Sequence, residues 1–466
     1  MQNGTKWHGL PLEIRRSILM VLIRDKHPGW ASLASVCTEW QSVIERENLR
    51  RITLEGDQIH QLQRMITQER RDRVEQIHLD VSLLLYGCEL CQEPEDLMDI
   101  GLNTGLVIAS LYRLLRVLSA WPSRPPGRGV RLELNAYSDS DNMHWYRHYY
   151  YGSPFERLKS DIGPHDPSHG WIDGSRTQTG LPNYIFVIRR SFRRCIIPSV
   201  MKQILQNMPC LEEFIYEPWR TWYYAFDVMV QRYPELDMDI DPPDTGIRKL
   251  VIFENVNDEL SIALNEAPSF RNFQDQVFPP ITEAFAWASR EYEDVWVSLL
   301  FDAKVFFSKC YENYTWWRLR SLCLTSPVLD STRPVEAATL IHDAAKVALR
   351  MPWLQTLVLW NGEQRGEACA FIYRKSDAGP SITWRGTWDI DLHLTSEIVE
   401  AWKSVVSQTC WRDLCLCFER VEEEIRFLGD AIYYLRLPCQ VIEPQSLWEM
   451  RREERTIVSS SLAEVE

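Results

Sequence analysis

Two segments of this sequence, far apart along the chain, follow the same plan. Residues 200–216 and 344–359 each read as an amphipathic helix, a Met-Pro pair and a short apolar strand. The helix has to end near the residue before the proline, because the proline ring disfavours helical backbone at that residue. The leucine two residues after each proline, Leu211 or Leu354, then starts the packing of the strand. A helix followed by a strand is therefore the predicted unit of the fold.

Weaker copies of the strand half recur along the chain, at residues 49–54, 74–79, 130–134, 247–253, 319–324 and 414–418. Strands that alternate with helices favour parallel pairing, because each helix supplies the long connection that a parallel strand needs. The expected fold class is therefore α/β. The recurring unit favours an irregular, leucine-rich-repeat-like solenoid of alternating helices and strands, and the alternative is a single doubly wound α/β domain.

Two stretches depart from this pattern. Residues 137–182 are rich in Ser, Asp, Gly, Pro, His and Tyr and show neither helical nor strand periodicity, so we expect a long surface insertion there. Residues 449–466 are charged and then small and polar, which is typical of a frayed or disordered tail. The predicted α/β domain accordingly spans residues 55–448.

The first fifty residues follow a different pattern. Apolar residues recur at helical spacing from Leu12 to Leu22, and Pro11 lies where proline is favoured, in the first turn of a helix. His27-Pro28-Gly29 breaks this helix, and a second apolar stripe runs from Leu33 to Ile44 at offsets of three and four. Two such helices cannot form a sufficient core alone. They must therefore pack on the following domain, on a partner, or on both.

These fifty residues also carry a known sequence pattern. The pattern comprises Leu10-Pro11-Leu12-Glu13-Ile14, Ile18-Leu19, Leu22, Leu33, Val36-Cys37, Trp40, Ile44 and Leu49. In this order the residues resemble the F-box, over the first 54 of the 466 residues. One departure is Pro28-Gly29-Trp30, which replaces the acidic-leucine pair that often opens the next helix of an F-box. The resemblance implies that residues 1–54 form an F-box helical module.

In the F-box family, the Leu-Pro end and the exposed apolar face of the helices bind a Skp-type adaptor, which bridges to a cullin scaffold. The resemblance therefore implies adaptor contact for Leu10, Pro11, Ile14, Ile18, Leu22 and Leu33. It implies packing within the module for Val36, Trp40 and Ile44. F-box proteins of fungi often carry divergent leucine-rich domains, which favours the solenoid. The alternative for this segment is a helical hairpin that only caps the C-terminal domain.

Charge and hydropathy limit the partners of the chain. Its 65 acidic and 51 basic residues give a formal net charge of -14. Proteins whose main partner is nucleic acid usually carry a clustered excess of Lys and Arg, so we expect no such partner. No apolar run reaches the ~18 to 20 residues that span a bilayer, and residues 1–10 show no secretory signal. We expect a cytoplasmic and/or nuclear protein without a membrane partner. In such a reducing compartment most of its cysteines should be free thiols that pack as small hydrophobic residues.

Motifs for catalysis or metal binding are sparse. Cys88-Glu89-Leu90-Cys91 lacks the second ligand pair that a structural zinc site needs. The pairs His144/His148 and His165/His169 lie in the predicted insertion, where we expect exposed loop histidines. No Walker loop, G-x-S-x-G elbow, Rossmann glycine fingerprint or H-E-x-x-H helix appears. We therefore expect a non-enzyme without cofactor or metal, and a metal-dependent hydrolase that uses these histidines is the least favoured alternative.

Aromatic residues follow the predicted strand at residues 214–216. Trp219, Trp222, Tyr223 and Tyr224 are candidates for target binding, because aromatic residues on loops often anchor interfaces. The alternative is that they fill gaps in an irregular repeat. The resemblance implies the substrate-recognition subunit of a Skp-cullin-F-box ubiquitin ligase, which binds the adaptor through the F-box and an unknown target protein through the C-terminal domain. The alternative function is a protein-binding repeat scaffold that acts outside a ubiquitin ligase.

Overall fold

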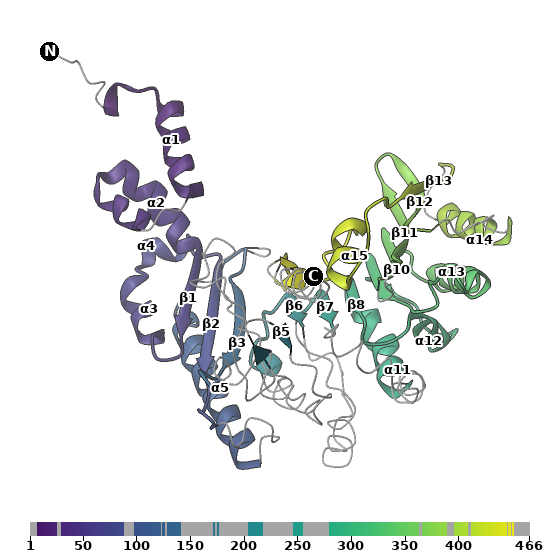
Figure 1. Cartoon of the computed structure of the whole chain (residues 1–466), viewed down its shortest axis with the longest axis horizontal. Coiled ribbons are helices and arrows are strands. Elements are labelled where there is room, and N and C mark those ends of the chain that lie inside the picture. Colours follow the sequence, from purple (N-terminus) through teal and green to yellow (C-terminus); the bar gives the residue numbers. More distant parts are fainter. Residues whose placement is uncertain are drawn as a thin grey trace. The chain divides into compact units, whose positions relative to one another are not determined.

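The computed structural model shows a mixed α/β protein that divides into two compact units (Figure 1). Unit 1 comprises Met1–Arg176 with Arg189–Arg194, and unit 2 comprises Thr177–Ile188 with Cys195–Glu466. The sequence pattern does not indicate this division. The structure describes residues 7–25, 29–87, 97–122, 124–125, 128–140, 171–172, 175–176, 204–217, 246–254, 279–362, 366–388, 396–408, 412–444, 446–448 and 450–451.

Unit 1 begins with a helical segment, which consists of η1 (Trp7–Gly9), α1 (Leu12–Asp25), η2 (Trp30–Ser35) and α2 (Thr38–Arg50). Pro11 directly precedes α1, where its missing N–H removes no helical hydrogen bond. Gly29 caps η2 with a φ of 83°, a left-handed conformation that favours glycine, and so turns the chain between the two helical stretches. Helices are thus present in both predicted regions, the second one beginning with a 3₁₀ turn.

The rest of unit 1 is built on a three-stranded parallel sheet of β1 (Arg51–Glu55), β2 (Gln76–Ser82) and β3 (Arg131–Tyr137). The strands are connected by α3 (Ile59–Met65), α4 (Gln68–Arg71) and α5 (Leu97–Leu118). Side chains of β2, α3 and α5 share a core that includes Leu62, Leu79 and Leu114. A short antiparallel pair, β4 (Trp171–Ile172) and β5 (Ser175–Arg176), completes the described part of this unit.

Unit 2 is built on an eight-stranded sheet whose strands lie side by side in sequence order. These are β6 (Glu213–Tyr216), β7 (Lys249–Phe253), β8 (Asp294–Ser298), β9 (Ser321–Thr325), β10 (Thr356–Asn361), β11 (Cys369–Ser376), β12 (Gly379–Gly386) and β13 (Cys415–Arg420). The pairs from β6 to β10 are parallel, and so is the pair of β12 and β13. β11 pairs antiparallel with β10 and β12, so the predicted parallel arrangement holds for only part of the sheet.

Helices and apolar side chains cover both faces of this sheet. The covering helices are α11 (Pro279–Ala288), α12 (Ala303–Ser308), α13 (Pro334–Ala348), α14 (Ser396–Ser407) and α15 (Leu428–Leu435), with a short η7 (Ser289–Glu291) after α11. α11 to α14 lie on one face and α15 lies on the other (Figure 1). A Cβ on Gly362, directly after β10, would lie 2.4 Å from the Cβ of Ala431, so this glycine permits the close approach of α15. Burial on both faces explains why β9 and β10 read as continuous apolar runs.

The two Met-Pro segments form equivalent turns. The amide of Leu211 donates to the carbonyl of Met208 at 3.0 Å, and the amide of Leu354 donates to that of Met351 at 3.1 Å. In each case a helix precedes the turn and a strand of the eight-stranded sheet follows it. The second copy is buried at Leu354, whereas Leu211 is only partly buried, since β6 is an edge strand of the described sheet.

A repeated backbone contact precedes the parallel strands of unit 2. The carbonyl just before one strand accepts hydrogen bonds from two successive amides in front of the next strand. Glu293, for example, accepts from Arg320 at 2.6 Å and from Ser321 at 3.1 Å. The carbonyls of Glu212, Arg248 and Arg320 make the same pair of contacts with the following connection. Each strand therefore begins in the same relation to its neighbour.

The predicted strand positions are confirmed at β1, β2, β3, β7, β9 and β13, and at the two Met-Pro copies, β6 and β10. The pattern misses β8, because residues 255–303 read as one long gap between strands. It also misses the β11–β12 hairpin, whose connection is only Asp377 and Ala378.

Candidate functional site

The first long helix of unit 1 presents apolar side chains on two sides. Leu19 and Ile23 are buried against the protein. Ile14, Ile18 and Val21 are 48%, 37% and 56% exposed. Because a helix has about 3.6 residues per turn, offsets of four and three place these three side chains on one side, opposite Leu19 and Ile23. We call Ile14, Ile18 and Val21 the α1 stripe.

Polar and aromatic contacts hold the beginning of this segment against α2. The guanidinium of Arg15 lies 2.6 Å from the carboxylate of Glu39, and the indole Nε1 of Trp7 donates to the same carboxylate at 3.0 Å. The ring of Trp7 lies 5.1 Å from that of Trp40, measured between centroids. The turn that carries Leu10 and Pro11 lies between Trp7 and Arg15, so these contacts fix it on both sides.

The residues assigned to adaptor contact all retain accessible surface. Pro11, Ile14 and Ile18 are exposed, and Leu10, Leu22 and Leu33 are partly exposed. Val21 is not among the residues that the resemblance assigns to adaptor contact, although its position three residues after Ile18 is sufficient to identify it. Leu12 and Met20 are not among them either, and these two are exposed on other sides of the helix.

The residues assigned to packing within the module differ in their burial. Ile44 is fully buried, and Trp40 is partly buried beside Trp7. Val36 departs from the expectation, since it is 58% exposed. The chain breaks the helical repeat at this point: Val36 ends η2, and the extended residue Cys37 then caps α2. The three-and-four spacing therefore does not carry over from α2 to Val36.

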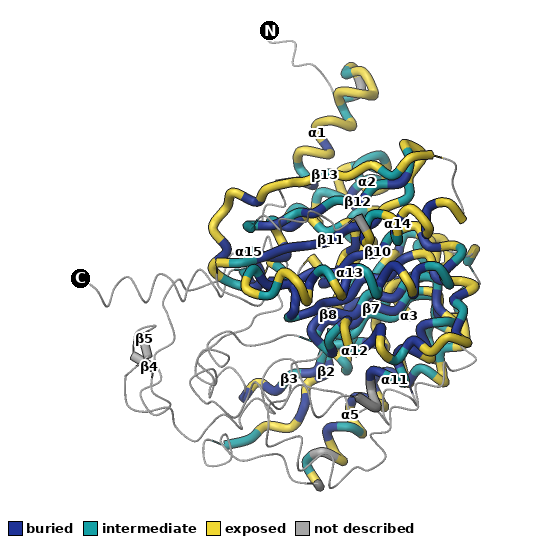
Figure 2. The backbone as a smooth tube through the Cα atoms, turned by 90° about the vertical axis from the view of Figure 1, so that its right-hand side faces the viewer, coloured by how far each residue is buried: buried dark blue, intermediate teal, exposed yellow. Residues whose placement is uncertain are grey.

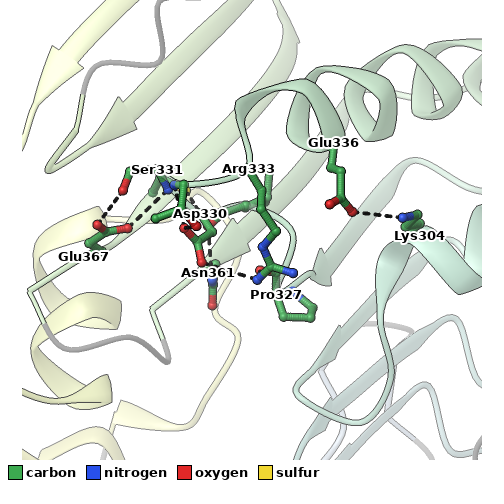
Figure 3. Close-up of polar contacts among 11 residues, drawn as sticks. Lys304, Pro327, Asp330, Ser331, Arg333, Glu336, Asn361 and Glu367 are labelled. Carbon is green, nitrogen blue, oxygen red and sulfur yellow. Dashed lines mark hydrogen bonds and ion pairs between the residues drawn. The ribbon is translucent and has the colours of Figure 1, made fainter. Parts of the chain in front are cut away.

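A buried polar network lies in the turn between β9 and α13 (Figure 3). One carboxylate oxygen of Asp330 accepts from the amide and from the hydroxyl of Thr332, both at 2.7 Å. The other oxygen lies 3.3 Å from the guanidinium of Arg333, which also donates to the carbonyl of Pro327 at 2.6 Å. Through these contacts the carboxylate of Asp330 holds Thr332 and Arg333, and Arg333 in turn holds Pro327 on the other side of the turn.

Neighbouring strand ends extend this network. The hydroxyl of Ser331 donates to Glu367 at 2.6 Å, and the side-chain amide of Asn361 donates to the carbonyl of Leu329 at 3.0 Å (Figure 3). Polar groups that are buried in this way normally satisfy one another in a structural turn. Within the described ranges, no group of three or more His, Cys, Asp or Glu residues could hold a metal ion. We therefore assign the network a structural role, the positioning of α13.

A second polar cluster lies on the sheet of unit 1. The two ring nitrogens of the buried His78 lie 2.9 Å from Glu133 and 3.0 Å from Asp80. Burial disfavours the charged ring, but the hydrogen bonds and charges of the two carboxylates outweigh it and raise the pKa of His78 to about 9. Burial likewise opposes ionisation of Glu133, yet His78 and Arg51 hold the pKa of that carboxyl below its usual value. A ring that donates both of its protons cannot serve as a general base at neutral pH.

Several predicted sites lie outside the described residues. They are the target-binding candidates Trp219, Trp222, Tyr223 and Tyr224, the Cys88/Cys91 pair, and the four histidines of the insertion. These stay predictions. Among the described free cysteines, Cys310, Cys323, Cys369 and Cys439 are buried, as expected for small apolar residues, whereas Cys210 and Cys415 are exposed and Cys37 and Cys417 are partly exposed.

Comparison with known proteins finds similarity in unit 2 alone. No curated protein and no solved structure matches the chain, and no described helix is long and apolar enough to cross a membrane. Residues 241–443, less than half of the chain, match a family described as a family of unknown function, DUF6546. The match covers β7 to β13 and α11 to α15, which is the described sheet of unit 2 without β6, together with the helices that cover it.

Proposed function

We propose that this chain is the substrate-recognition subunit of a Skp-cullin-F-box ubiquitin ligase. Residues 1–54 are its F-box, and the α1 stripe is the observation that carries the proposal. Three apolar side chains at helical spacing face away from the core of unit 1. A contiguous apolar surface of this kind is typical of a helix that binds a partner protein.

The occupant that we propose for this surface is a Skp-type adaptor. The sequence resemblance places Leu10, Pro11, Ile14, Ile18, Leu22 and Leu33 at the adaptor, and each of them has accessible surface. Val21 extends the same side of α1. The contacts among Trp7, Arg15 and Glu39 hold this surface in one arrangement before a partner arrives. Preorganisation of this kind lowers the entropy cost of binding.

For the α/β part of the chain we propose an irregular, leucine-rich-repeat-like solenoid. The strands of unit 2 follow one another in sequence order, whereas a doubly wound sheet reverses its order at a switch point. The repeated backbone contact before the strands and the equivalent turns at Met208 and Met351 also support a repeating unit. The β11–β12 hairpin is the irregular element.

The target protein binds to the C-terminal domain in this proposal. α15 and the segment after it already cover one face of the eight-stranded sheet, with Ala431 and Val441 in the same core as Val358. We therefore keep the loop aromatics Trp219, Trp222, Tyr223 and Tyr224 as the candidate contacts. The ubiquitin-transfer chemistry comes from the other subunits, and this chain acts by proximity, in the cytoplasm or the nucleus.

Calorimetric titration of the purified full chain with a purified Skp-type adaptor tests the proposal. The replacements Ile14→Asp and Val21→Asp should each weaken adaptor binding at least about tenfold, because a charge in an apolar interface is poorly solvated. The double replacement Leu10→Ala with Pro11→Ala should act in the same direction. Met65→Asp is the matched control, since Met65 is an equally accessible apolar residue of unit 1 outside the stripe. Thermal melting should show that all variants remain folded.

Two outcomes would contradict the ligase assignment. If the wild type does not bind the adaptor, the alternative of a capping helical hairpin on a repeat scaffold becomes the better explanation. If the wild type binds but Ile14→Asp and Met65→Asp weaken binding equally, the α1 stripe is not the contact surface.

A further inference from the structure

The described sheet of unit 2 ends at β13, and this edge strand is exposed along most of its length, unlike β10 and β11 (Figure 2). β13 pairs with β12, and no described strand pairs with its other edge. Leu416 and Phe418 are 39% and 58% exposed, although their neighbours on β12, Ile382 and Trp384, are buried. The apolar face of the sheet therefore continues onto β13 and meets solvent there.

This edge lacks the features that normally prevent a second strand from pairing. Edge strands of native proteins are usually protected by charges, proline or a bulge. Residues 415–418 contain neither a charge nor a proline. The first charged residue is Glu419, which forms an ion pair with Arg385 on the neighbouring strand at 2.6 Å. Residues 415–418 are therefore a template for another strand.

A second copy of β13 can pair with this edge in only a few symmetric registers. Side chains alternate between the two faces of a strand, and residues directly opposite each other must lie on the same face. In a symmetric antiparallel pair of identical strands, one residue must then lie opposite the same residue of the other copy. We name the position of the two-fold axis by this residue. Near the centre of the apolar stretch this residue is Leu416, Cys417 or Phe418.

Two of these registers are unfavourable. With the axis at Leu416, Asp413 of one copy lies opposite Glu419 of the other, and like charges at such positions are destabilising. With the axis at Phe418, Asp413 of one copy lies opposite Glu423 of the other, which is again a pair of like charges.

The register with its axis at Cys417 avoids the like-charge pair, because Asp413 then lies opposite Val421. It sets Leu416 of each copy opposite Phe418 of the other, so the apolar pair is made twice. Just beyond the strand ends, it sets Arg412 opposite Glu422, and these charges have opposite sign. Aromatic and aliphatic cross-strand pairs and opposite charges both stabilise a sheet.

We propose that β13 is a self-association surface, through which two copies of this chain pair antiparallel with the two-fold axis at Cys417. The sheets of unit 2 in the two copies then form one continuous sheet, and the exposed apolar pair becomes buried. This surface lies outside residues 1–54, so dimer formation does not depend on the F-box proposal.

Sedimentation velocity of the purified full chain over a range of concentrations tests the dimer. The wild type should change from monomer to dimer as its concentration rises. Phe418→Glu should raise the dissociation constant at least about tenfold, because it places a charge in the apolar pair. Trp317→Glu is the control, since Trp317 is also an exposed apolar residue of unit 2. Circular dichroism should show the same fold in each variant.

Cross-linking with diamide tests the register. Diamide takes up two hydrogens while two thiols join as a disulfide, and the axis places Cys417 of one copy opposite Cys417 of the other. Within one chain, the sulfurs of Cys415 and Cys417 lie 3.8 Å apart and compete for the oxidant. Cys415→Ser should therefore increase the yield of the dimer that is linked through Cys417, as identified by peptide mapping.

Three results would overturn this inference. One is a wild type that stays monomeric at every concentration, even if another protein then pairs with the edge. Another is a dimer that Phe418→Glu does not weaken. The third is a cross-linked wild-type dimer in which peptide mapping finds no disulfide between the two Cys417 residues, which would exclude the proposed axis.

Discussion

Ile18 and Leu19 are neighbours in α1, yet Leu19 is fully buried and Ile18 belongs to the exposed α1 stripe. Leu19→Ala should lower the free energy of unfolding of unit 1 by ~2 to 5 kcal/mol, because it leaves a cavity in the core. Ile18→Ala should change that free energy by less than ~1 kcal/mol and should instead weaken adaptor binding. Urea unfolding followed by tryptophan fluorescence measures the first effect, and calorimetric titration measures the second. Equal losses of stability for Ile18→Ala and Leu19→Ala would show that the α1 stripe packs against the protein and is not available to a partner.

The two Met-Pro turns allow a second paired comparison. Leu354 packs in the core between the sheet and its helices, whereas Leu211 is half-buried at the edge strand β6. Leu354→Ala should therefore destabilise unit 2 by ~2 to 5 kcal/mol, and Leu211→Ala by clearly less. The two free energies come from denaturant unfolding of the full chain. A larger loss at Leu211 would mean that the two turns are not equivalent in their packing.

Local chemistry explains why part of this fold could be predicted from the sequence. Pro209 and Pro352 end the preceding helices through steric conflict with the residue before them, and short apolar runs mark the strands. These effects act over a few residues, so they are visible in the sequence. The α1 stripe is also visible, because helical spacing alone places Ile14, Ile18 and Val21 on one side.

Features that depend on pairing between distant segments could not be predicted in this way. His78 lies directly opposite Glu133 in the register of β2 and β3, and no local pattern relates these two residues. The β11–β12 hairpin has no helix between its strands, and the apolar residues of β12 alternate with polar ones, so a search for a helix followed by an apolar strand does not find it. The prediction that Val36 is buried is wrong for a local reason. Helical spacing applies only within one helix, and the chain is not helical between η2 and α2.

The polar network before α13 can be tested by comparison with a nearby surface pair. Asp330 is buried and accepts three contacts from Thr332 and Arg333. Asp330→Ala should lower the free energy of unfolding by ~1.5 to 3 kcal/mol, because it removes the buried carboxylate that accepts the hydrogen bonds of this turn. Glu336→Ala, which removes an exposed ion pair with Lys304, should cost less than ~1 kcal/mol (Figure 3). Thermal and urea unfolding compare the two, and similar losses would exclude the structural role of Asp330.

The buried histidine of unit 1 predicts a dependence of stability on alkaline pH. The folded-state pKa of His78 is about 9, above the ordinary value of 6.5. Its charged form is therefore more favourable in the folded protein than in the unfolded one. The resulting stabilisation is complete below pH ~6.5 and is lost as the pH rises through 9. At 1.36 kcal/mol per pKa unit, the full effect is on the order of 3 kcal/mol.

Urea unfolding of the wild type and of His78→Gln between pH 6 and pH 10 measures this effect. The wild type should lose stability over the range in which His78 deprotonates, because the neutral ring keeps only one N–H donor for the two carboxylates of Asp80 and Glu133. His78→Gln should be less stable than the wild type at pH 6 and should show a flatter profile. His60→Gln is the control, since His60 is an exposed histidine of the same unit, and it should keep the wild-type profile. A wild-type profile that is flat to pH 10 would show that the two carboxylates do not hold the proton on His78.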